Sequence, residues 1–220
     1  MQNSVHFPAI PEAAVSLNNK QLTIHKELYR QRTCFNARFF LYLCRIFTRT
    51  IVIMTKANKV LFITQEITPY VSESEMANIG RHLPQAIQEK GREIRTFMPK
   101  WGNINERRNQ LHEVIRLSGM NLIIDDTDHP LIIKVASIQS ARMQVYFIDN
   151  DDYFQNRLQT ADENGVEYDD NDSRAIFYAR GVLETVKKLR WCPDVIHCHG
   201  WMTALAPLYI KKAYKDEPSF

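Results

Sequence analysis

The spacing of apolar residues changes along the chain in the way expected of alternating strands and helices. Residues 59–64 form a short apolar run, typical of a strand buried on both faces of a parallel sheet. Residues 76–87 then carry apolar side chains at helical spacing, and Gly91 follows as a left-handed stop. A second strand is expected over 93–98, closed by Pro99. This order predicts a strand, helix, strand unit.

The middle of the chain is richer in strands than in helices. Strand-like stretches lie at 114–117, 131–138 and 143–148, and the polar segment 125–128 has the composition of a turn. We therefore expect a β-hairpin insertion in this part of the sheet.

The last part of the chain returns to helix and strand. Residues 173–189 form an amphipathic pattern at helical spacing, and a strand is expected over 194–199. A final helix is expected from Trp201 to about Tyr214, kinked at Pro207. Together these elements predict an α/β fold, with a Rossmann-like parallel sheet that has helices on both faces.

Residues 1–53 show no sustained period, and the character of the sequence changes at Met54. We expect a leader upstream of the true start at Met54, followed by one domain over 54–220. A signal peptide is the alternative, but the apolar stretch lies far from the N-terminus and lacks a small-residue cleavage site. Two arginines interrupt the apolar run 39–54, so no membrane span is expected.

Charge and cysteine usage narrow the class of protein. Residues 1–53 hold seven of the 28 basic residues and two of the 25 acidic ones. The remaining 21 basic and 23 acidic residues give 54–220 a net charge of −2, so no nucleic-acid partner is expected. The four cysteines form no Cys-x-x-Cys pair and no dense framework, which favours a reducing, cytoplasmic setting.

Four segments in one order carry a resemblance to a known family. They are Lys59–Val71 (KVLFITQEITPYV), Met98–Gly102 (MPKWG), Val145–Phe154 (VYFIDNDDYF) and Pro193–Leu205 (PDVIHCHGWMTAL). This text resembles the N-terminal part of the glycogen and starch synthases, family 5 of the GT-B glycosyltransferases, from Lys59 to about Lys212. Several motifs in the right order are far more specific than one.

The resemblance implies a function in glycogen biosynthesis. Members of the family transfer glucose from ADP-glucose to the non-reducing end of an α-1,4-glucan, in a cleft between two Rossmann-like domains. This chain resembles the acceptor-side half of that GT-B architecture and is expected to be C-terminally incomplete. The expected partners are an α-glucan such as glycogen, ADP-glucose, and a separate chain that carries the second domain. No cofactor, metal or membrane is expected.

The first departure from the family lies before the first long helix. Where the family has a Lys-x-Gly-Gly-Leu loop, this chain has Ser72, Glu73, Ser74, Glu75 and Met76. The glycines would let backbone N–H groups approach the sugar nucleotide, and that approach is lost here. We interpret the segment as a capping box in which Ser72 and Glu75 satisfy each other's backbone donors. A rebuilt ligand loop is the alternative.

The second departure lies after the last strand. The family text His-x-His-Asp-Trp appears here as His197-Cys198-His199-Gly200-Trp201, so the aspartate is missing at Gly200. The two histidines share a face of the strand, but no third metal ligand has suitable spacing. We expect a structural role for His197 and contact with glucan or sugar by His199 or Trp201.

The acidic cluster 149–152 follows a strand and invites a catalytic interpretation. A structural role in turns is favoured, because Asx residues make turns and cap helices, and 162–172 is expected to be a solvated loop.

Three functions follow for the whole chain. The first is an ADP-glucose-dependent α-glucan synthase. The second, which we favour for the chain as it stands, is a catalytically weak or inactive glucan-binding module that has lost the donor loop, and the chain alone is expected to be inactive. The third, a generic Rossmann nucleotide binder, lacks any Gly-x-Gly-x-x-Gly after a predicted strand.

Overall fold

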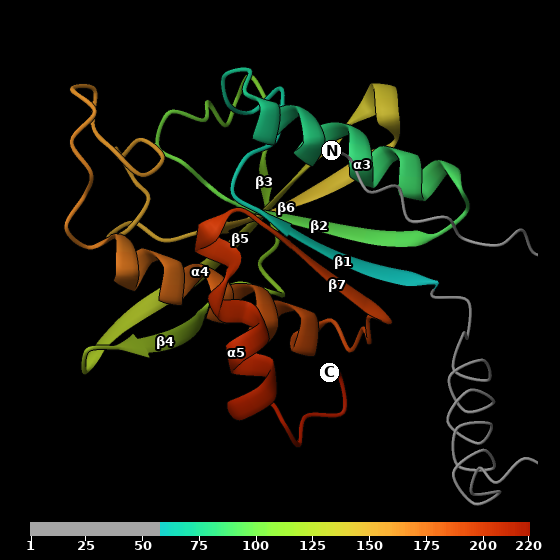
Figure 1. The fold of residues 1–220 in the computed structure, drawn as a ribbon. Coiled ribbons are helices and arrows are strands. Elements are labelled where there is room, and N and C mark those ends of the chain that lie inside the picture. The colour runs from blue at the N-terminus through green and yellow to red at the C-terminus, as the bar shows by residue number, and fades with distance from the viewer. Residues whose placement is uncertain (1–57) are drawn as a thin grey trace, which may run out of the picture. The chain divides into compact units, whose positions relative to one another are not determined.

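A mixed seven-stranded sheet organises residues 58–220, the part of the chain that the computed structural model describes (Figure 1). The strands are β1 (Lys59–Thr64), β2 (Glu93–Pro99), β3 (His112–Glu113), β4 (Met120–Ile124), β5 (Thr127–Ile138), β6 (Met143–Asp149) and β7 (Val195–His199). The order is β3-β5-β6-β2-β1-β7, and β4 pairs with β5. Strands β6, β2, β1 and β7 are parallel, whereas β5 runs antiparallel to β6. The carboxyl ends of the four parallel strands therefore meet at one edge of the sheet.

Helices cover both faces of this sheet, as the sequence predicts. The α-helices are α3 (Glu75–Glu89), α4 (Asn171–Lys188) and α5 (Leu205–Lys212), and the short 3-10 helices are η2 (Gln139–Ala141) and η3 (Trp201–Thr203). Figure 1 shows α3 on one face of the sheet, with α4 and α5 on the other. The α/β fold with a Rossmann-like parallel region and a hairpin insertion is thus confirmed, with the refinement that the sheet is mixed.

The core lies between the parallel strands and α4. Leu61 and Ile63 of β1 are fully buried, as is Tyr178 of α4. The Tyr178 hydroxyl donates to the carbonyl oxygens of Thr64 (2.7 Å) and Phe97 (2.9 Å), which lie at or next to the carboxyl ends of β1 and β2. Because both acceptors are backbone groups, this bond fixes α4 relative to the strand ends.

The hairpin differs in position from the prediction. The expected strand over 114–117 is a turn, in which the amide of Leu117 donates to the carbonyl of Val114. The strand is β4 instead, where Leu122 and Ile124 are buried and alternate with exposed residues. Strands β4 and β5 join at Asp125 and Asp126, both with positive φ, as a two-residue hairpin turn demands.

The last predicted helix is two separate elements. Residues 201–203 form η3, and α5 begins only at Leu205. Pro207 therefore lies in the first turn of α5, where a missing N–H costs no intrahelical hydrogen bond. The predicted kink at Pro207 is wrong for this reason.

Some predictions fall outside the described residues. The leader over 1–53, the start at Met54 and the apolar run 39–54 lie in residues 1–57. Within 58–220, none of the helices combines the length and the apolar character that crossing a bilayer requires.

Candidate functional site

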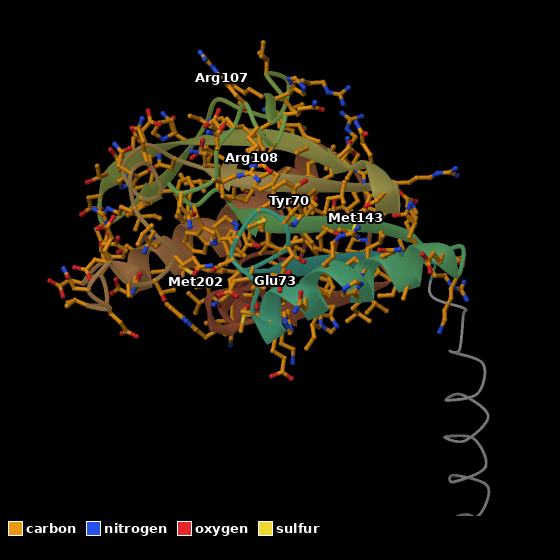
Figure 2. All side chains as sticks on the ribbon, turned by 90° about the horizontal axis from the view of Figure 1, so that it is seen from above. Tyr70, Glu73, Arg107, Arg108, Met143 and Met202 are labelled. Atoms are coloured by element: carbon orange, nitrogen blue, oxygen red, sulfur yellow. The ribbon has the colours of Figure 1, made fainter. Side chains whose placement is uncertain are left out.

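The carboxyl ends of β1 and β7 lie side by side. Thr64 is the register partner of His199, so the loops that follow these two residues start from neighbouring positions. In open α/β sheets, ligands bind beyond the carboxyl ends of the strands. In Figure 2, Glu73 from the loop after β1 and Met202 from η3 lie toward one end of the sheet, whereas Met143, where β6 begins, lies toward the other. Most of the predicted site residues come from these two loops.

The helix cap after β1 differs in register from the predicted capping box. Ser74, in extended conformation, is the N-cap of α3, and its hydroxyl accepts from the Ala77 amide at 2.9 Å. Ser72 is exposed and lies outside the helix, so the predicted Ser72–Glu75 pairing is wrong. The cap lies two residues later, because α3 begins at Glu75 rather than near Glu73. Glu75 does occupy the first turn, where a carboxylate suits the positive end of the helix dipole.

Ser74 also ties this loop to the end of β1. Its hydroxyl donates to a carboxylate oxygen of Glu66 at 2.5 Å. The Glu66 carbonyl accepts from the Thr64 hydroxyl at 3.1 Å, which holds the backbone just after the strand. Glu73 and Glu75 are exposed. Of the four loop positions, the structure therefore gives Ser74 a structural role and leaves three side chains facing solvent.

The two histidines of β7 share one face of the sheet with Phe62. His197 stacks on Phe62 with ring centroids 4.7 Å apart, and the His199 ring lies 6.1 Å from Phe62. Burial lowers the pKa of His197, and neighbouring His199 lowers it further. His199 is half-buried, and its buried Nε2 atom has no hydrogen-bond partner among the described residues. His197 therefore packs in the structure, whereas His199 keeps an unused polar atom.

No metal site forms around these histidines. Residues 58–220 contain no group of three or more His, Cys, Asp or Glu side chains arranged to hold a metal ion. The histidine rings are also 6.1 Å apart, centroid to centroid.

Gly200 and Trp201 form the turn out of β7. Gly200 has φ 93° and ψ 155°, a conformation that is accessible essentially to glycine alone. Its carbonyl accepts from the Thr203 hydroxyl at 2.7 Å, which starts η3. Trp201 leaves half of its surface exposed (50%), and its ring is free to meet a ligand. An exposed aromatic ring with a polar edge suits a sugar better than a packing role does.

Gln65 lies beside the predicted site residues, and the sequence analysis did not single it out. It is the first residue after β1 and is only 6% exposed. Its carbonyl accepts from Trp101 Nε1 at 2.8 Å, and its side chain lies against Gly200. The clue in the sequence was Gly200 itself, because a glycine has no side chain and leaves room for a neighbouring one.

The acidic cluster after β6 has the structural role that was expected. Asp149 is buried and pairs with Lys134 Nζ at 2.7 Å. Burial raises the pKa of Asp149, and the Lys134 ammonium opposes that shift. The Asn150 side chain accepts from the amides of Asp152 and Tyr153, at 2.9 and 3.1 Å. These side chains therefore stabilise each other, and they offer no obvious pair of catalytic carboxylates.

Lys100, from the MPKWG segment, joins this network as the first residue after β2. It is 7% exposed and lies 3.1 Å from Glu106, which also pairs with Lys134 at 2.7 Å. Two cations and two carboxylates thus balance each other beside the strand ends. In the sequence, the clue to this network was a lysine that directly follows an apolar strand.

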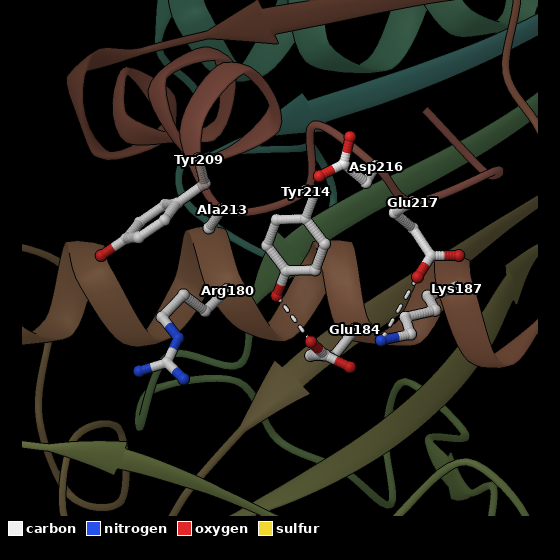
Figure 3. Close-up of a pocket in the computed structure, with 8 residues that line it drawn as sticks. All are labelled: Arg180, Glu184, Lys187, Tyr209, Ala213, Tyr214, Asp216 and Glu217. Carbon is white, nitrogen blue, oxygen red and sulfur yellow. Dashed lines mark hydrogen bonds and ion pairs between the residues drawn. The ribbon is translucent and has the colours of Figure 1, made fainter.

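A pocket of about 490 Å³ lies elsewhere, between α4 and α5 (Figure 3). Four of its polar groups form two pairs, since Tyr214 donates to Glu184 at 2.6 Å and Lys187 lies 3.3 Å from Glu217. None of the predicted site residues lines it. We place the candidate site at the strand ends rather than in this pocket, because the predicted site residues lie in the loops after β1 and β7.

Comparison with known proteins identifies the family of this chain. Residues 59–220 match the family model of the starch synthase catalytic domain. The glycogen synthase of Chlorobium limicola is 41% identical over 163 residues, which cover 74% of this chain and 33% of that protein. The glycogen synthase of Pelodictyon phaeoclathratiforme is 40% identical over 169 residues, which cover 76% and 35%.

A solved structure shares the fold. It is the catalytic domain of starch synthase IV from Arabidopsis thaliana bound to ADP and acarbose, with a TM-score of 0.63 at 20% identity. The match covers 74% of this chain and 32% of that one. The chain thus spans about a third of the length of these proteins. With a family model matched over 59–220 and relatives at about 40% identity, the chain belongs to the family of starch synthase catalytic domains.

Proposed function

We propose that residues 58–220 form the acceptor-side domain of an ADP-glucose-dependent α-glucan synthase. The observation that carries this proposal is the match of 59–220 to the starch synthase catalytic domain, which includes both strand-end loops of the candidate site. In the proposed reaction, the bond between glucose C1 and the ADP β-phosphate oxygen breaks. A new bond forms between C1 and the 4-hydroxyl oxygen at the non-reducing end of the glucan, with retention at C1. ADP leaves, and the hydroxyl proton is released.

The domain's part in this reaction is to hold sugar. Trp201 is half exposed, and two residues before it the buried Nε2 atom of His199 has no hydrogen-bond partner among the described residues. Neutral polar groups beside an aromatic ring suit a hydroxylated, uncharged ligand such as a glucan. No cofactor or metal takes part in this proposal, and the proposed location is the cytoplasm.

Most contacts to the ADP moiety would come from a second Rossmann-like domain, in the same polypeptide or in a separate chain. The loop before α3 gives a diphosphate little help, because Glu73 and Glu75 are exposed there and repel an anion. Ser74 is already engaged as the N-cap.

A working transferase is favoured over an inactive glucan-binding module. The relatives at about 40% identity are glycogen synthases, and the substituted loop folds into a properly capped helix. Loss of the glycines therefore does not disrupt the domain that presents the acceptor.

The test is a chimera in which 59–220 replace the matched third of the Chlorobium limicola glycogen synthase. ADP release from ADP-glucose is measured with glycogen as acceptor, for the chimera, the parent enzyme and the chain alone. We expect turnover by the chimera within about two orders of magnitude of the parent, and none by the chain alone. A folded chimera that binds ADP-glucose but releases no ADP above the glycogen-free background would contradict the proposal and favour the inactive module.

A further inference from the structure

The backbone at Gly200 excludes a side chain for two separate reasons. Its φ of 93° strains any L-residue, and a Cβ built there would lie 2.5 Å from Gln65 Oε1 and 2.7 Å from Gln65 Cδ. Both separations are far below van der Waals contact. The volume that a side chain at position 200 would use is therefore already filled by Gln65.

The Gln65 side chain is held in this place from two sides. Its Oε1 lies 3.4 Å from the Met202 amide, and its own backbone carbonyl is fixed by Trp101 Nε1. The side chain cannot swing freely, because the residue is only 6% exposed. Its Oε1 accepts the bond from the Met202 amide, whereas its Nε2 atom makes no hydrogen bond to any residue of 58–220. One donor of this amide thus has no partner among the described residues, beside the loops that follow β1 and β7.

We propose that Gln65 is the residue that binds a glucose unit of the α-glucan beside β7. In this chain, the carboxylate that the family text carries after the second histidine is replaced by an amide that reaches the same volume from β1. This inference rests on the proposed function and deepens it by naming a ligand-contacting residue. Gln65 lies against Gly200, and the next residue, Trp201, is half exposed, so an amide and an aromatic ring belong to the same turn.

The chemistry of this cluster fits a glucan rather than a charged ligand. A primary amide donates and accepts hydrogen bonds without carrying charge, which matches sugar hydroxyls. A neutral group also avoids the cost of burying a carboxylate at a site that is only 6% exposed. The substitution of an acidic residue by Gly200 and Gln65 therefore keeps a polar contact while removing a charge.

The experiment measures binding of maltoheptaose to the full 220-residue chain and to two variants. Gln65→Met keeps the length and volume of the side chain but removes both polar atoms. The matched control is Gln144→Met, because Gln144 also uses one Oε1 hydrogen bond, from Tyr146 at 3.2 Å, but is an exposed residue of β6. Circular dichroism and thermal unfolding of each variant establish that it is folded.

We expect Gln65→Met to weaken maltoheptaose binding about fivefold, as the loss of roughly one hydrogen bond predicts, and Gln144→Met to leave it unchanged. If the wild-type chain binds maltoheptaose and folded Gln65→Met binds equally well, the assignment of Gln65 is wrong while the proposed function stands. If the wild-type chain binds no maltoheptaose at millimolar concentrations, the glucan-binding part of the proposed function fails, and this assignment fails with it. Should Gln65→Met not fold, Gln65→Asn, which keeps an amide but shortens it, is measured in its place with the same expectation.

Discussion

Two ends of the same sheet edge differ in how their polar groups are used. After β6, the polar groups of Asp149 and Asn150 are paired within the protein. After β1 and β7, Gln65 Nε2 and the buried His199 Nε2 have no partner among the described residues, and Trp201 is half exposed. Both ends are rich in polar side chains, and the second contains polar atoms that no described residue uses.

The difference shows why an acidic cluster is a weaker indicator of function than an unpaired neutral group. Carboxylates after a strand are easily satisfied by nearby amides and by lysines such as Lys134. A buried imidazole nitrogen without a partner has a free-energy cost that binding a ligand can recover. Substitutions at the two ends test this difference.

The largest effect on stability is expected from Arg174→Met, at the β6 end of the sheet edge. Arg174 is fully buried and donates to the carbonyls of Tyr153 and Leu158 and to the Asn171 side chain, at 2.9, 3.1 and 2.7 Å. Burial lowers its pKa to about 10, so it remains charged and strongly bonded near neutral pH. Loss of these bonds should lower the free energy of unfolding by about 4 kcal/mol. Urea denaturation measures this change, with exposed Arg107→Met as the control; equal stabilities would refute it.

A smaller effect on stability is expected from Gly200→Ala, at the end of the sheet edge formed by the loops after β1 and β7. The new methyl group meets both a positive φ and the Gln65 side chain, which should cost about 3 kcal/mol of stability. Gly91→Ala is the matched control, since Gly91 also has a positive φ (73°) but no atom within 4 Å of the added Cβ. That variant should lose only about 1 kcal/mol. Thermal unfolding compares the two, and an equal loss would show that Gln65 does not occupy this volume.

The corrected cap position predicts a third, more modest effect. Ser74→Ala removes the acceptor for the Ala77 amide and should cost about 1 kcal/mol, whereas Ser72→Ala should cost almost nothing. The free energy of unfolding in urea distinguishes the two serines. A larger loss for Ser72 than for Ser74 would restore the capping box that the sequence suggested.

The smallest effect is a pH dependence at His197. Its folded-state pKa lies below the ordinary value because of burial, so the unfolded chain binds the proton more tightly. The stability that neutral His197 provides is therefore full well above its unfolded-state pKa of about 6.5. It is lost as the pH falls from there toward the lower folded-state pKa. His197→Phe, which keeps the stack on Phe62, should flatten the fall in stability between pH 7.5 and 5. Parallel pH profiles for the variant and the wild-type chain would contradict this.

Periodicity along the chain was enough to predict most of the fold. The strands at 59–64 and 93–99 and the helix at 171–188 appear close to where apolar spacing placed them. These elements are buried, so their patterns are strong. Strand β4 was missed because Met120–Ile124 is short and half exposed, while the β-branched Val114 and Ile115 suggested a strand in a segment that forms a turn.

The site was only partly predictable, for a different reason. The sequence placed His199, Gly200 and Trp201 together because they are neighbours in the chain. Gln65 reaches Gly200 across 135 residues of sequence, through the parallel pairing of β1 with β7. A side chain that fills the room beside a distant glycine leaves no local pattern, so only the three-dimensional arrangement reveals it.

The most direct test of the central claim is to map maltoheptaose binding by NMR on the isotope-labelled 220-residue chain. The account predicts that amide and side-chain signals of Gln65, His199, Gly200 and Trp201 shift on titration, while those of Asp149–Tyr153 and of the pocket between α4 and α5 stay in place. Shifts confined to the β6 end or to that pocket, with the signals of Gln65 and Trp201 unmoved, would contradict it.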